Sequence, residues 1–400
     1  MSSRESPGTL QAMLQPGKTI GMIGGGQLGR MLTREARRTG YRVVVFTDEY
    51  PPSPAGQLAD REINAPYFDP EATSTFIRDI DVATLEFENI PPDFLAAVEQ
   101  RVTVHPGRDA LAICQNREKE KNFLREQGIP HAEFRVVEDA VSLGEAVAAL
   151  GTPCVLKTAA FGYDGKGQRK IDSQEDWGQV WQEFGASRGV VEQWIPFQRE
   201  VSVVSARAKN GEMAHFPLAE NIHVNHILDT TIVPARGCDP ELETEAGNLA
   251  AHVAEALSFV GTLGVEMFVT REGKLLVNEI APRPHNSGHF SIDACVTNQF
   301  EQQLRAITGQ PLGDTSLLSG VVMKNLLGDL WPEPTVAPDW SPILEQSNAK
   351  LHLYGKRLGR PGRKMGHFCV LDDSIDKALE TADRLFDSIK SQVSNHSPSD

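Results

Sequence analysis

The sequence lacks the surplus of positive charge that a binder of nucleic acids or membrane surfaces needs. Its 400 residues include 39 Lys or Arg and 54 Asp or Glu, which gives a formal net charge of −15 at neutral pH. Nucleic acids and membrane surfaces both present phosphate, so the proteins that bind them present a basic face. We therefore expect no nucleic-acid or membrane partner, and we expect local groups to hold any anionic ligand.

Long apolar runs and paired cysteines are missing as well. No run approaches the roughly 18 apolar residues that span a bilayer. The five cysteines lie far apart without a Cys-x-x-Cys pair, so the sequence indicates neither a zinc knuckle nor a disulfide framework. Residues 1–17 contain no apolar segment typical of a secretory signal, and we expect them to be a disordered extension of a cytoplasmic protein.

The order of apolar segments predicts three domains with α/β and α+β character. Alternating strands and helices in residues 18–113 indicate a doubly wound, Rossmann-like domain with a parallel sheet. Short strands, glycine-rich turns and a few helices follow in residues 114–310, starting within one helix predicted for residues 109–127. Residues 311–400 are expected to form a small strand-rich domain with a disordered, serine-rich tail.

The first glycine-rich motif, Gly24-Gly25-Gly26-Gln27-Leu28-Gly29, lies between a predicted strand and a predicted helix. With Asp48 at the end of the next strand, it is typical of a dinucleotide site. Backbone N–H groups at a helix start can hold any phosphate, however, and glycines also permit a tight turn without any ligand. The motif alone leaves these three interpretations open.

A second glycine-rich loop, residues 161–168, lies between two predicted strands. It is not a Walker A loop, because Gly167 rather than Ser or Thr follows Lys166. A loop with three glycines and a lysine can close over phosphates, and Lys157 would direct a second positive charge at them. A surface hairpin is the alternative.

The predicted strands 264–270 and 275–280 form a hairpin that carries two acidic residues. A turn centred on Glu272 and Gly273 places Glu266 directly opposite Glu279, about 5 Å apart, which destabilises a sheet unless a cation lies between them. Mg²⁺ suits this position because it binds one or two carboxylates together with phosphate oxygens. Asn278 would reach the same face only if the strand bulges.

Three further segments contain candidate binding residues. A strand that ends at Ile195-Pro196 can offer its backbone to an adenine edge, and Glu200 beyond it can hold ribose hydroxyls; an ordinary buried strand is the alternative. In the rigid loop 282–289, prolines and a glycine argue against a zinc-binding helix. Its Arg283, Asn286 and histidines would face the same cleft as Glu279, and the alternative is that the histidines only form hydrogen bonds within the loop. The stretch 346–371 contains six Lys or Arg and no Asp or Glu, which suits either a phosphate monoester or a solvated basic face.

In this order, the motifs GGGQLGRM, GYDGKGQ, VNEIAPRPHNSGH and YGKRLGRPGRKMGH resemble the ATP-grasp family, over nearly the whole chain from Lys18 to about Leu371. The last two motifs are similar to the branch that carboxylates a nucleotide in purine biosynthesis. The resemblance implies an ATP-grasp fold and a reaction of ATP, bicarbonate and aminoimidazole ribonucleotide through carboxyphosphate. It also implies Mg²⁺, a homodimer and a possible hand-over of product to the mutase of the next step.

By motif position, the resemblance also implies the site residues. The implied ATP contacts are Arg117, Lys157, Gly162, Tyr163, Asp164, Gly165, Lys166, Gly167, Gln168, Glu192, Gln193, Trp194, Ile195, Glu200, His223, Asn278 and Glu279. The implied metal ligands are Glu266 and Glu279. The implied nucleotide-substrate contacts are Gln27, Leu28, Glu86, His285, Asn286, Lys356, Arg363 and Lys364.

For the chemistry, three residues are expected to be catalytic. Arg283 would orient bicarbonate, Asp164 would position the substrate amine, and Lys157 would neutralise phosphate charge. Two alternatives are a sister ligase that activates formate on a glycinamide ribonucleotide and an NAD-dependent oxidoreductase. The oxidoreductase leaves the paired glutamates, the second glycine loop and the basic segment unexplained.

Overall fold

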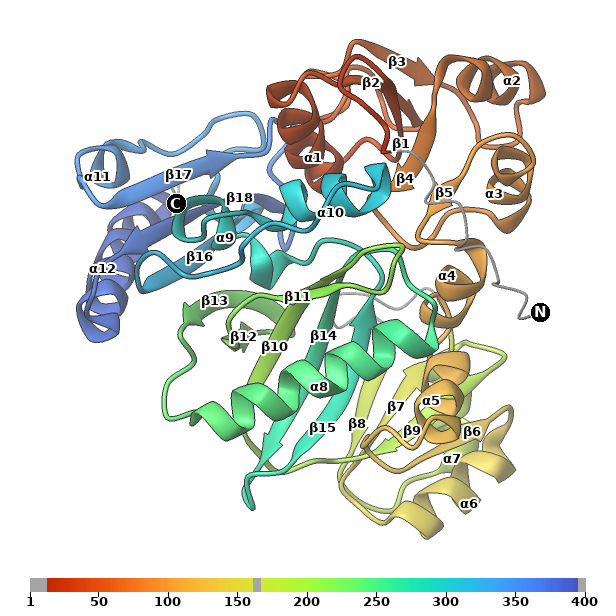
Figure 1. The fold of residues 1–400 in the computed structure, drawn as a ribbon. Coiled ribbons are helices and arrows are strands. Elements are labelled where there is room, and N and C mark those ends of the chain that lie inside the picture. Colours follow the sequence, from red (N-terminus) through yellow and green to blue (C-terminus); the bar gives the residue numbers. More distant parts are fainter. Residues whose placement is uncertain (1–12, 161–166, 395–400) are drawn as a thin grey trace, which may run out of the picture.

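The computed structural model describes residues 13–160 and 167–394, in which three sheets are arranged around a central junction (Figure 1). The first sheet is parallel throughout, with strand order β3-β2-β1-β4-β5. Its strands are β1 (Thr19–Ile23), β2 (Arg42–Thr47), β3 (Arg61–Asn64), β4 (Val82–Leu85) and β5 (Val104–His105). The expected doubly wound N-terminal architecture is confirmed.

Helices cover both faces of this parallel sheet, which explains why its central strands are apolar along their whole length. On one face lie α2 (Pro70–Asp79) and α3 (Pro92–Glu99), whose Phe76 and Phe94 pack on Phe46 of β2. On the other face, α1 (Gln27–Arg38) packs beside α10 (Gln299–Thr308), a helix from much later in the chain. The N-terminal sheet therefore shares its core with the central part of the molecule.

Residues 13–17 differ from the expected disordered extension. The Leu14 N–H donates to the carbonyl of Thr308 at 2.8 Å, and the Tyr41 hydroxyl donates to the carbonyl of Leu14 at 2.5 Å. These bonds hold the segment against α10 and the end of α1.

The helix predicted for residues 109–127 is two helices, α4 (Arg108–Cys114) and α5 (Arg117–Glu126). Asn116 separates them because its side chain accepts a hydrogen bond from the Lys119 N–H and thereby caps α5. The Arg117 N–H donates to the carbonyl of Ala159 at 2.7 Å. The break thus fixes the start of α5, and with it Arg117, beside the following sheet.

The second sheet is a small antiparallel layer with strand order β6-β9-β7-β8. It consists of β6 (Phe134–Val137), β7 (Cys154–Thr158), β8 (Gln168–Ile171) and β9 (Gly189–Gln193). Two helices, α6 (Ala140–Leu150) and α7 (Trp177–Phe184), pack on one face of it with their apolar residues. Lys157 and Glu192 lie on neighbouring strands of this sheet.

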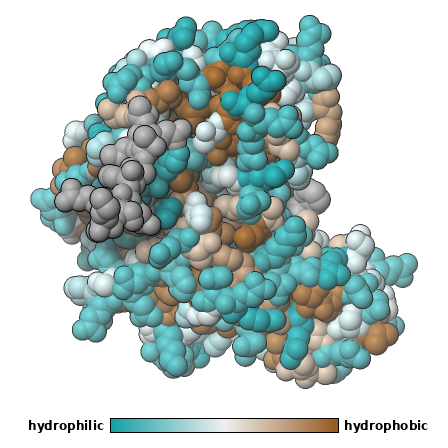
Figure 2. Space-filling model, turned by 45° about the vertical axis from the view of Figure 1, so that its right-hand side comes forward, coloured by the Kyte–Doolittle hydropathy of each residue, from teal (hydrophilic) through white to brown (hydrophobic). Residues whose placement is uncertain are grey.

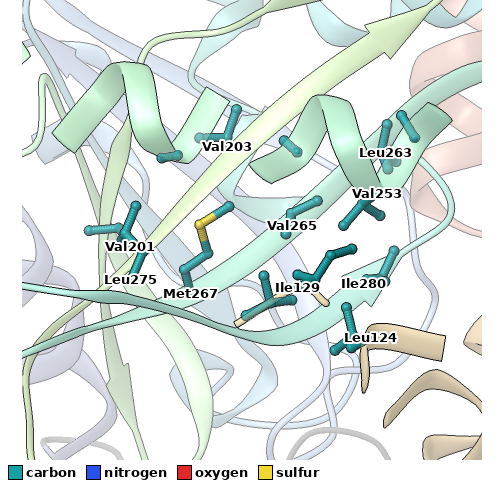
Figure 3. Close-up of a cluster of buried hydrophobic side chains, with 14 of the residues drawn as sticks. Leu124, Ile129, Val201, Val203, Val253, Leu263, Val265, Met267, Leu275 and Ile280 are labelled. Carbon is teal, nitrogen blue, oxygen red and sulfur yellow. The ribbon is translucent and has the colours of Figure 1, made fainter. Parts of the chain in front are cut away.

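The third sheet is a long antiparallel layer with the order β15-β14-β10-β12-β13-β16-β18-β17, and β11 pairs with β10. Its first members are β10 (Phe197–Arg207), β11 (Met213–His215), β12 (Ala219–Val224), β13 (Ile227–Val233), β14 (Gly261–Thr270) and β15 (Leu275–Ala281). The helix α8 (Pro240–Ala256) lies across one face (Figure 1). Its Val253 packs against Val265 and Ile280, together with Leu124 of α5 (Figure 3).

The C-terminal strands continue this third sheet. They are β16 (Val321–Leu327), β17 (Ala349–Leu353) and β18 (Lys364–Leu371), and β16 pairs with β13. Residues 375–394 form a long helix, α12 (Ile375–Ser394), where strands and a disordered tail are expected from the sequence. Its Ala378, Ala382, Leu385 and Ile389 recur at helical spacing and pack on Phe368 and Val370, which stabilises the helix.

Short elements complete the junction between these layers. They are the helices η1 (Asn286–Gly288), α9 (Ser291–Ala294), η2 (Gly328–Leu330) and α11 (Ser341–Leu344). In the face of the molecule drawn in Figure 2, hydrophilic residues form most of the outer contour, and hydrophobic residues lie mainly between them. Among the described residues, no helix combines the length and the apolar character needed to cross a membrane.

Candidate active site

The acidic hairpin has the predicted facing glutamates and one extra residue. Glu266 of β14 pairs directly with Glu279 of β15, whereas Met267 pairs with Val277, so that Asn278 is a β-bulge. The predicted turn is wrong by one residue, because Val269 pairs with Leu275 and the Thr270 N–H bonds to the Lys274 carbonyl. The bulge compensates for this shift and restores the pairing of the glutamates.

The bulge also places Asn278 and Glu279 on one face. Val277 and Ile280 are both buried in the core under α8 although they are three residues apart, which a regular strand does not allow. The two residues between them consequently point away from that core. Asn278 and Glu279 line a cavity together with residues of the preceding loops and helices, namely Glu88, Asn89, Cys114, Gln115, Arg117, Glu120, Lys157, Ala159 and Ala160.

The two hairpin carboxylates have opposite pKa shifts. Desolvation within the concave site and repulsion by Glu266 raise the pKa of Glu279. Desolvation opposes the shift at Glu266, but its hydrogen bond to His285 and nearby positive charges lower its pKa. Glu266 is thus the firmly ionised member, and Glu279 is the one that a cation would stabilise most.

A chain of buried and partly buried hydrogen bonds holds the Glu266 carboxylate in place. His285 Nε2 lies 3.0 Å from Glu266 Oε1, and His285 Nδ1 lies 2.8 Å from the Ser287 hydroxyl. The Ser287 and Ser202 hydroxyls are 2.7 Å apart, and Asn221 Nδ2 donates to Ser202 at 2.8 Å. His285, which is expected to contact substrate, therefore orients the carboxylate of Glu266.

Glu192 is surrounded by three cations at the junction of the second and third sheets. Its carboxylate lies 3.1 Å from Lys157 Nζ, 3.3 Å from Lys121 Nζ and 3.9 Å from Arg117 Nε. Desolvation opposes the shift, but these cations lower the pKa of Glu192 to about 2. Burial lowers the pKa of Lys157. The Glu192 side chain is thereby committed to ion pairs, and its backbone lies within β9, between β6 and β7.

The remaining expected ATP contacts surround this junction. Gln193 ends β9, and Trp194 is 39% exposed under the Lys170 ammonium. Ile195 directly follows, and its carbonyl accepts a hydrogen bond from the Phe197 N–H. Farther along, His223 Nδ1 lies 2.7 Å from Glu200 Oε2. Desolvation opposes the shift, yet Glu200 and Glu266 raise the pKa of His223.

Part of the second glycine loop lies outside the described residues, namely Gly162, Tyr163, Asp164, Gly165 and Lys166. At the end of the loop, the Gly167 carbonyl accepts a hydrogen bond from the Thr158 N–H at 2.8 Å. Gly167 has a φ of 71°, a backbone conformation that favours glycine. Gln168 pairs with Lys157 in β7 and β8. The described end of the loop therefore lies beside the Lys157 cation.

Glu86 occupies part of the first glycine motif. Its carboxylate accepts the N–H of Gly26, and that of Gly29 at 2.8 Å. A Cβ atom on residue 26 would lie 2.6 Å from a Glu86 oxygen, so this close approach requires glycine. Of the four N–H groups that have no partner inside α1, those of Gln27 and Leu28 have no other partner among the described residues and remain for a ligand. The arrangement argues against a dinucleotide pyrophosphate, and the Leu28 side chain is buried in the core.

Basic residues of the C-terminal segment lie near Glu86. Burial and the Arg363 charge lower the pKa of Lys356 to about 8, while Glu86 and Glu49 oppose this shift. Burial raises the pKa of Glu86 to about 7. Lys364 begins β18, and its charge acts on both Lys356 and Glu266. These basic residues lie between the first glycine motif, residues 24–29, and the acidic hairpin.

Two residues of the loop after β15 have contrasting environments. Arg283 forms a two-pronged ion pair with Glu88, with Nε 2.6 Å and Nη2 3.2 Å from the carboxylate oxygens. Asn286 is 8% exposed, and neither polar atom of its side chain has a hydrogen-bond partner among the described residues. A buried amide without partners is costly, so its position fits a ligand contact.

Several site residues were missed from the sequence. Glu88, Glu120 and Lys121 face the junction, although the run Arg117–Lys121 reads as a solvated, charged helix face. The sequence did contain a signal for Lys121, because this residue lies one helical turn after Arg117 and must share a helix face with it. The acidic Glu88 likewise follows a parallel strand at its carboxyl end, where ligands of such sheets bind.

A parallel N-terminal sheet, followed by two antiparallel sheets with cations and carboxylates at their junction, defines the ATP-grasp class of ligases. Family models agree with this class along the chain. They are "Ribonucleotide synthetase preATP-grasp domain" at residues 17–115, "ATP-grasp domain" at 122–300 and "Phosphoribosylaminoimidazole carboxylase C-terminal domain" at 321–381.

Within that class, proteins named N5-carboxyaminoimidazole ribonucleotide synthase are similar to this chain over most of its length. The N5-carboxyaminoimidazole ribonucleotide synthase of Bacillus subtilis is 44% identical over 368 residues, which cover 92% of this chain and 95% of that protein. The crystal structure of an ADP complex of an enzyme of this name has a TM-score of 0.88 at 44% identity, covering 96% of this chain and 99% of that one. The Aspergillus clavatus enzyme in complex with ADP and 5-aminoimidazole ribonucleotide has a TM-score of 0.85 at 30% identity, covering 94% and 99%. The chain belongs to the family of N5-carboxyaminoimidazole ribonucleotide synthases, which are ATP-dependent ligases.

Proposed function

We propose that this protein uses ATP to join bicarbonate to the amine of 5-aminoimidazole ribonucleotide, giving the N5-carboxyamino product, ADP and phosphate. The observation that carries the proposal is the facing pair Glu266 and Glu279, next to a cavity lined by Arg117 and Lys157. Carboxylates and cations in one concavity suit a metal-bound polyphosphate. Membership of the family supplies the particular reaction.

The hairpin fits Mg²⁺, a hard cation that binds carboxylate and phosphate oxygens. No cluster of three or more His, Cys, Asp or Glu suited to a metal exists within residues 13–160 and 167–394. Two facing carboxylates therefore need oxygens from a ligand to complete a coordination shell, as Mg²⁺ commonly takes them from phosphates. We assign Glu266 and Glu279 as its ligands; the ion would neutralise the phosphates and align them for attack.

For ATP, we assign the phosphates to Arg117, Lys157 and the loop 162–168. The Glu192 side chain balances the charge of Lys157 before nucleotide arrives, because its carboxylate lies 3.1 Å from the ammonium. The backbone from Glu192 to Ile195 would meet the adenine edge, and Glu200 with His223 would hold the ribose hydroxyls. Asn278 would support Glu279 from the bulge.

For the nucleotide substrate, we assign the region between the glycine turn and the C-terminal basic residues. The free N–H groups of Gln27 and Leu28 and the side chains of Lys356, Arg363 and Lys364 are suited to its phosphate. Glu86 and the unpartnered amide of Asn286 provide polar contacts nearby. We place His285 one step away, as the partner of Glu266.

In the reaction, an oxygen of bicarbonate attacks the γ-phosphorus of ATP, and ADP leaves. Lys157 and Arg117 offset the negative charge that accumulates as the two anions meet. The substrate amine then attacks the carboxyl carbon of carboxyphosphate, and phosphate leaves. Arg283 is assigned to orient bicarbonate and Asp164 to position the amine. Because carboxyphosphate is labile in water, closure over the site is needed in this scheme.

The test is ADP release by the purified chain with each reactant omitted in turn. We expect release to require ATP, bicarbonate and 5-aminoimidazole ribonucleotide together, with the carboxyamino nucleotide as product. Formate with glycinamide ribonucleotide, the pair used by a sister ligase, is expected to give none. Release that depends on formate instead of bicarbonate would contradict the proposal.

We further propose a cytoplasmic homodimer that hands its product to the mutase of the next step. All five cysteines are free, as expected in a reducing compartment. Sedimentation of the purified chain tests the dimer, and a loss of free intermediate when the mutase is added tests the hand-over.

A further inference from the structure

The ion pair between Glu88 and Arg283 joins two domains at the active site. Glu88 follows β4 of the N-terminal sheet, and Arg283 follows β15 of the acidic hairpin. The carboxylate bridges Nε and Nη2 of the guanidinium at 2.6 and 3.2 Å. Such a fork fixes both the position and the plane of an arginine side chain.

The Glu88 side of this pair is held firmly. Gln115 Nε2 donates to the Glu88 carbonyl, and to that of Ile90 at 3.1 Å. The Ile90 N–H also donates to the Glu88 carbonyl at 2.9 Å. These bonds fix the backbone that carries the carboxylate. The position of Glu88 therefore determines the position of the Arg283 side chain, and not the reverse.

The Arg283 side retains a donor for a ligand. A guanidinium has five N–H groups, and Glu88 engages Nε and Nη2. Among the described residues, Nη1 contacts only the Pro284 carbonyl, at 3.5 Å. Desolvation opposes the shifts, but mutual attraction lowers the pKa of Glu88 and raises that of Arg283. Both partners are thus charged at neutral pH, and one edge of the arginine can still bind an anion.

We propose that Glu88 is a positioning residue for bicarbonate, acting through Arg283. Bicarbonate binding then depends on the position of the N-terminal domain relative to the acidic hairpin. This inference rests on the proposed function. Glu88 is two residues from Glu86, which closes the glycine turn assigned to the nucleotide substrate. One rigid segment therefore connects the substrate side to the arginine assigned to bicarbonate.

The alternative is that the Glu88–Arg283 ion pair only holds the two domains together. The chain contains a matched control for this alternative. Arg38 of α1 pairs with Glu301 of α10 at 2.5 Å, which also links the N-terminal domain to the central domain. Figure 1 shows α1 and α10 side by side. Arg38 is the last residue of α1, at the opposite end of the helix from Gln27 and Leu28. Glu301→Gln removes an interdomain carboxylate without touching Arg283.

The experiment measures initial rates of ADP and carboxyamino product formation for the full chain and for Glu88→Gln, Glu88→Asp and Glu301→Gln. We expect Glu88→Gln to raise the KM for bicarbonate, or to lower kcat, by about 10- to 100-fold, because a displaced arginine no longer orients the anion. The KM for ATP should change by less than about twofold. More ADP should form per product, whereas Glu301→Gln should behave as wild type.

The conservative and double variants complete the test. Glu88→Asp keeps the charge at shorter reach and should lie between wild type and Glu88→Gln. In an Arg283→Lys background, Glu88→Gln should add little further loss, since both act on one step. If Glu88→Gln equals Glu301→Gln in every kinetic parameter, or raises both KM values equally, the proposal is overturned. If Glu88→Gln does not fold, additive losses for Glu88→Asp in the Arg283→Lys background overturn it. Failure of the proposed function appears separately, as absent bicarbonate dependence in the wild type.

Discussion

Glu266 and Glu279 lie directly opposite each other in β14 and β15, and the bulge at Asn278 makes this pairing possible. Without the extra residue, the observed turn would pair Glu266 with Asn278 and would turn Glu279 toward the core. The bulge lets Val277 and Ile280 both remain under α8 while the acidic residue reaches the cavity. Packing of the core and placement of the proposed metal ligand thus depend on one irregular residue.

Glu279→Gln should reduce bicarbonate-dependent ADP formation by about 100-fold or more, because it removes a proposed metal ligand. The Mg²⁺ concentration for half-maximal rate should rise in parallel. Glu272→Gln, at the exposed tip of the same hairpin, serves as the control and should leave both quantities unchanged. A Glu279→Gln variant with the Mg²⁺ dependence of wild type would contradict the metal assignment.

Lys356→Ala should raise the KM for 5-aminoimidazole ribonucleotide by about 10- to 100-fold, since it removes one proposed charge-assisted hydrogen bond to the substrate phosphate. The KM for ATP should change by less than about twofold, because the ATP assignment does not include Lys356. Lys350→Ala, an exposed lysine of the same basic stretch on β17, is the matched control. Equal losses for both nucleotides would exclude a dedicated phosphate pocket at Lys356.

Local patterns in the sequence were sufficient for the parallel sheet and the acidic hairpin. Buried strands such as Thr19–Ile23 and Arg42–Thr47 are apolar runs flanked by helices, which is the signature of a parallel sheet. The hairpin register could be predicted from the sequence because, in an antiparallel hairpin, residues at equal distances from the turn face each other, and this places Glu266 opposite Glu279. Even there, an error of one residue in the turn was cancelled by a bulge that no local signal locates.

Contacts between distant segments were beyond this reasoning. Glu86 caps the start of α1 from 57 to 60 residues away, and Glu88 pairs with Arg283 across 195 residues. Neither distance appears in any periodic pattern, because both depend on how complete domains pack. The helix α12 is a different case: its apolar residues recur at helical spacing, so the pattern was available and was missed.

Glu86→Gln should change how stability varies with pH. Burial raises the pKa of Glu86 to about 7, above its ordinary value of 4.5, so the folded state binds this proton more tightly than the unfolded state. Its contribution is therefore complete below about pH 4.5 and is lost as pH rises through 7. The unfolding free energy of wild type relative to Glu86→Gln should fall by about 2 to 3 kcal/mol over this window, as measured by urea unfolding. Glu71→Gln, at an exposed site on α2, should show no such trend, and a pH-independent difference for Glu86→Gln would refute the shift.

Lys121→Met should weaken both the fold and ATP binding. The Lys121 side chain is 1% exposed, and its ammonium donates to the Asn278 carbonyl at 2.9 Å and lies 3.3 Å from Glu192. Without the ammonium, the Asn278 carbonyl loses its hydrogen bond and the buried Glu192 carboxylate loses one of three cations. This loss should destabilise the protein by about 2 to 4 kcal/mol. The KM for ATP should rise, because Asn278 and Glu192 both border the proposed nucleotide site. Lys119→Met, two positions earlier on the exposed side of α5, should do neither. A stability loss in Lys121→Met without any change in the KM for ATP would limit Lys121 to a structural role.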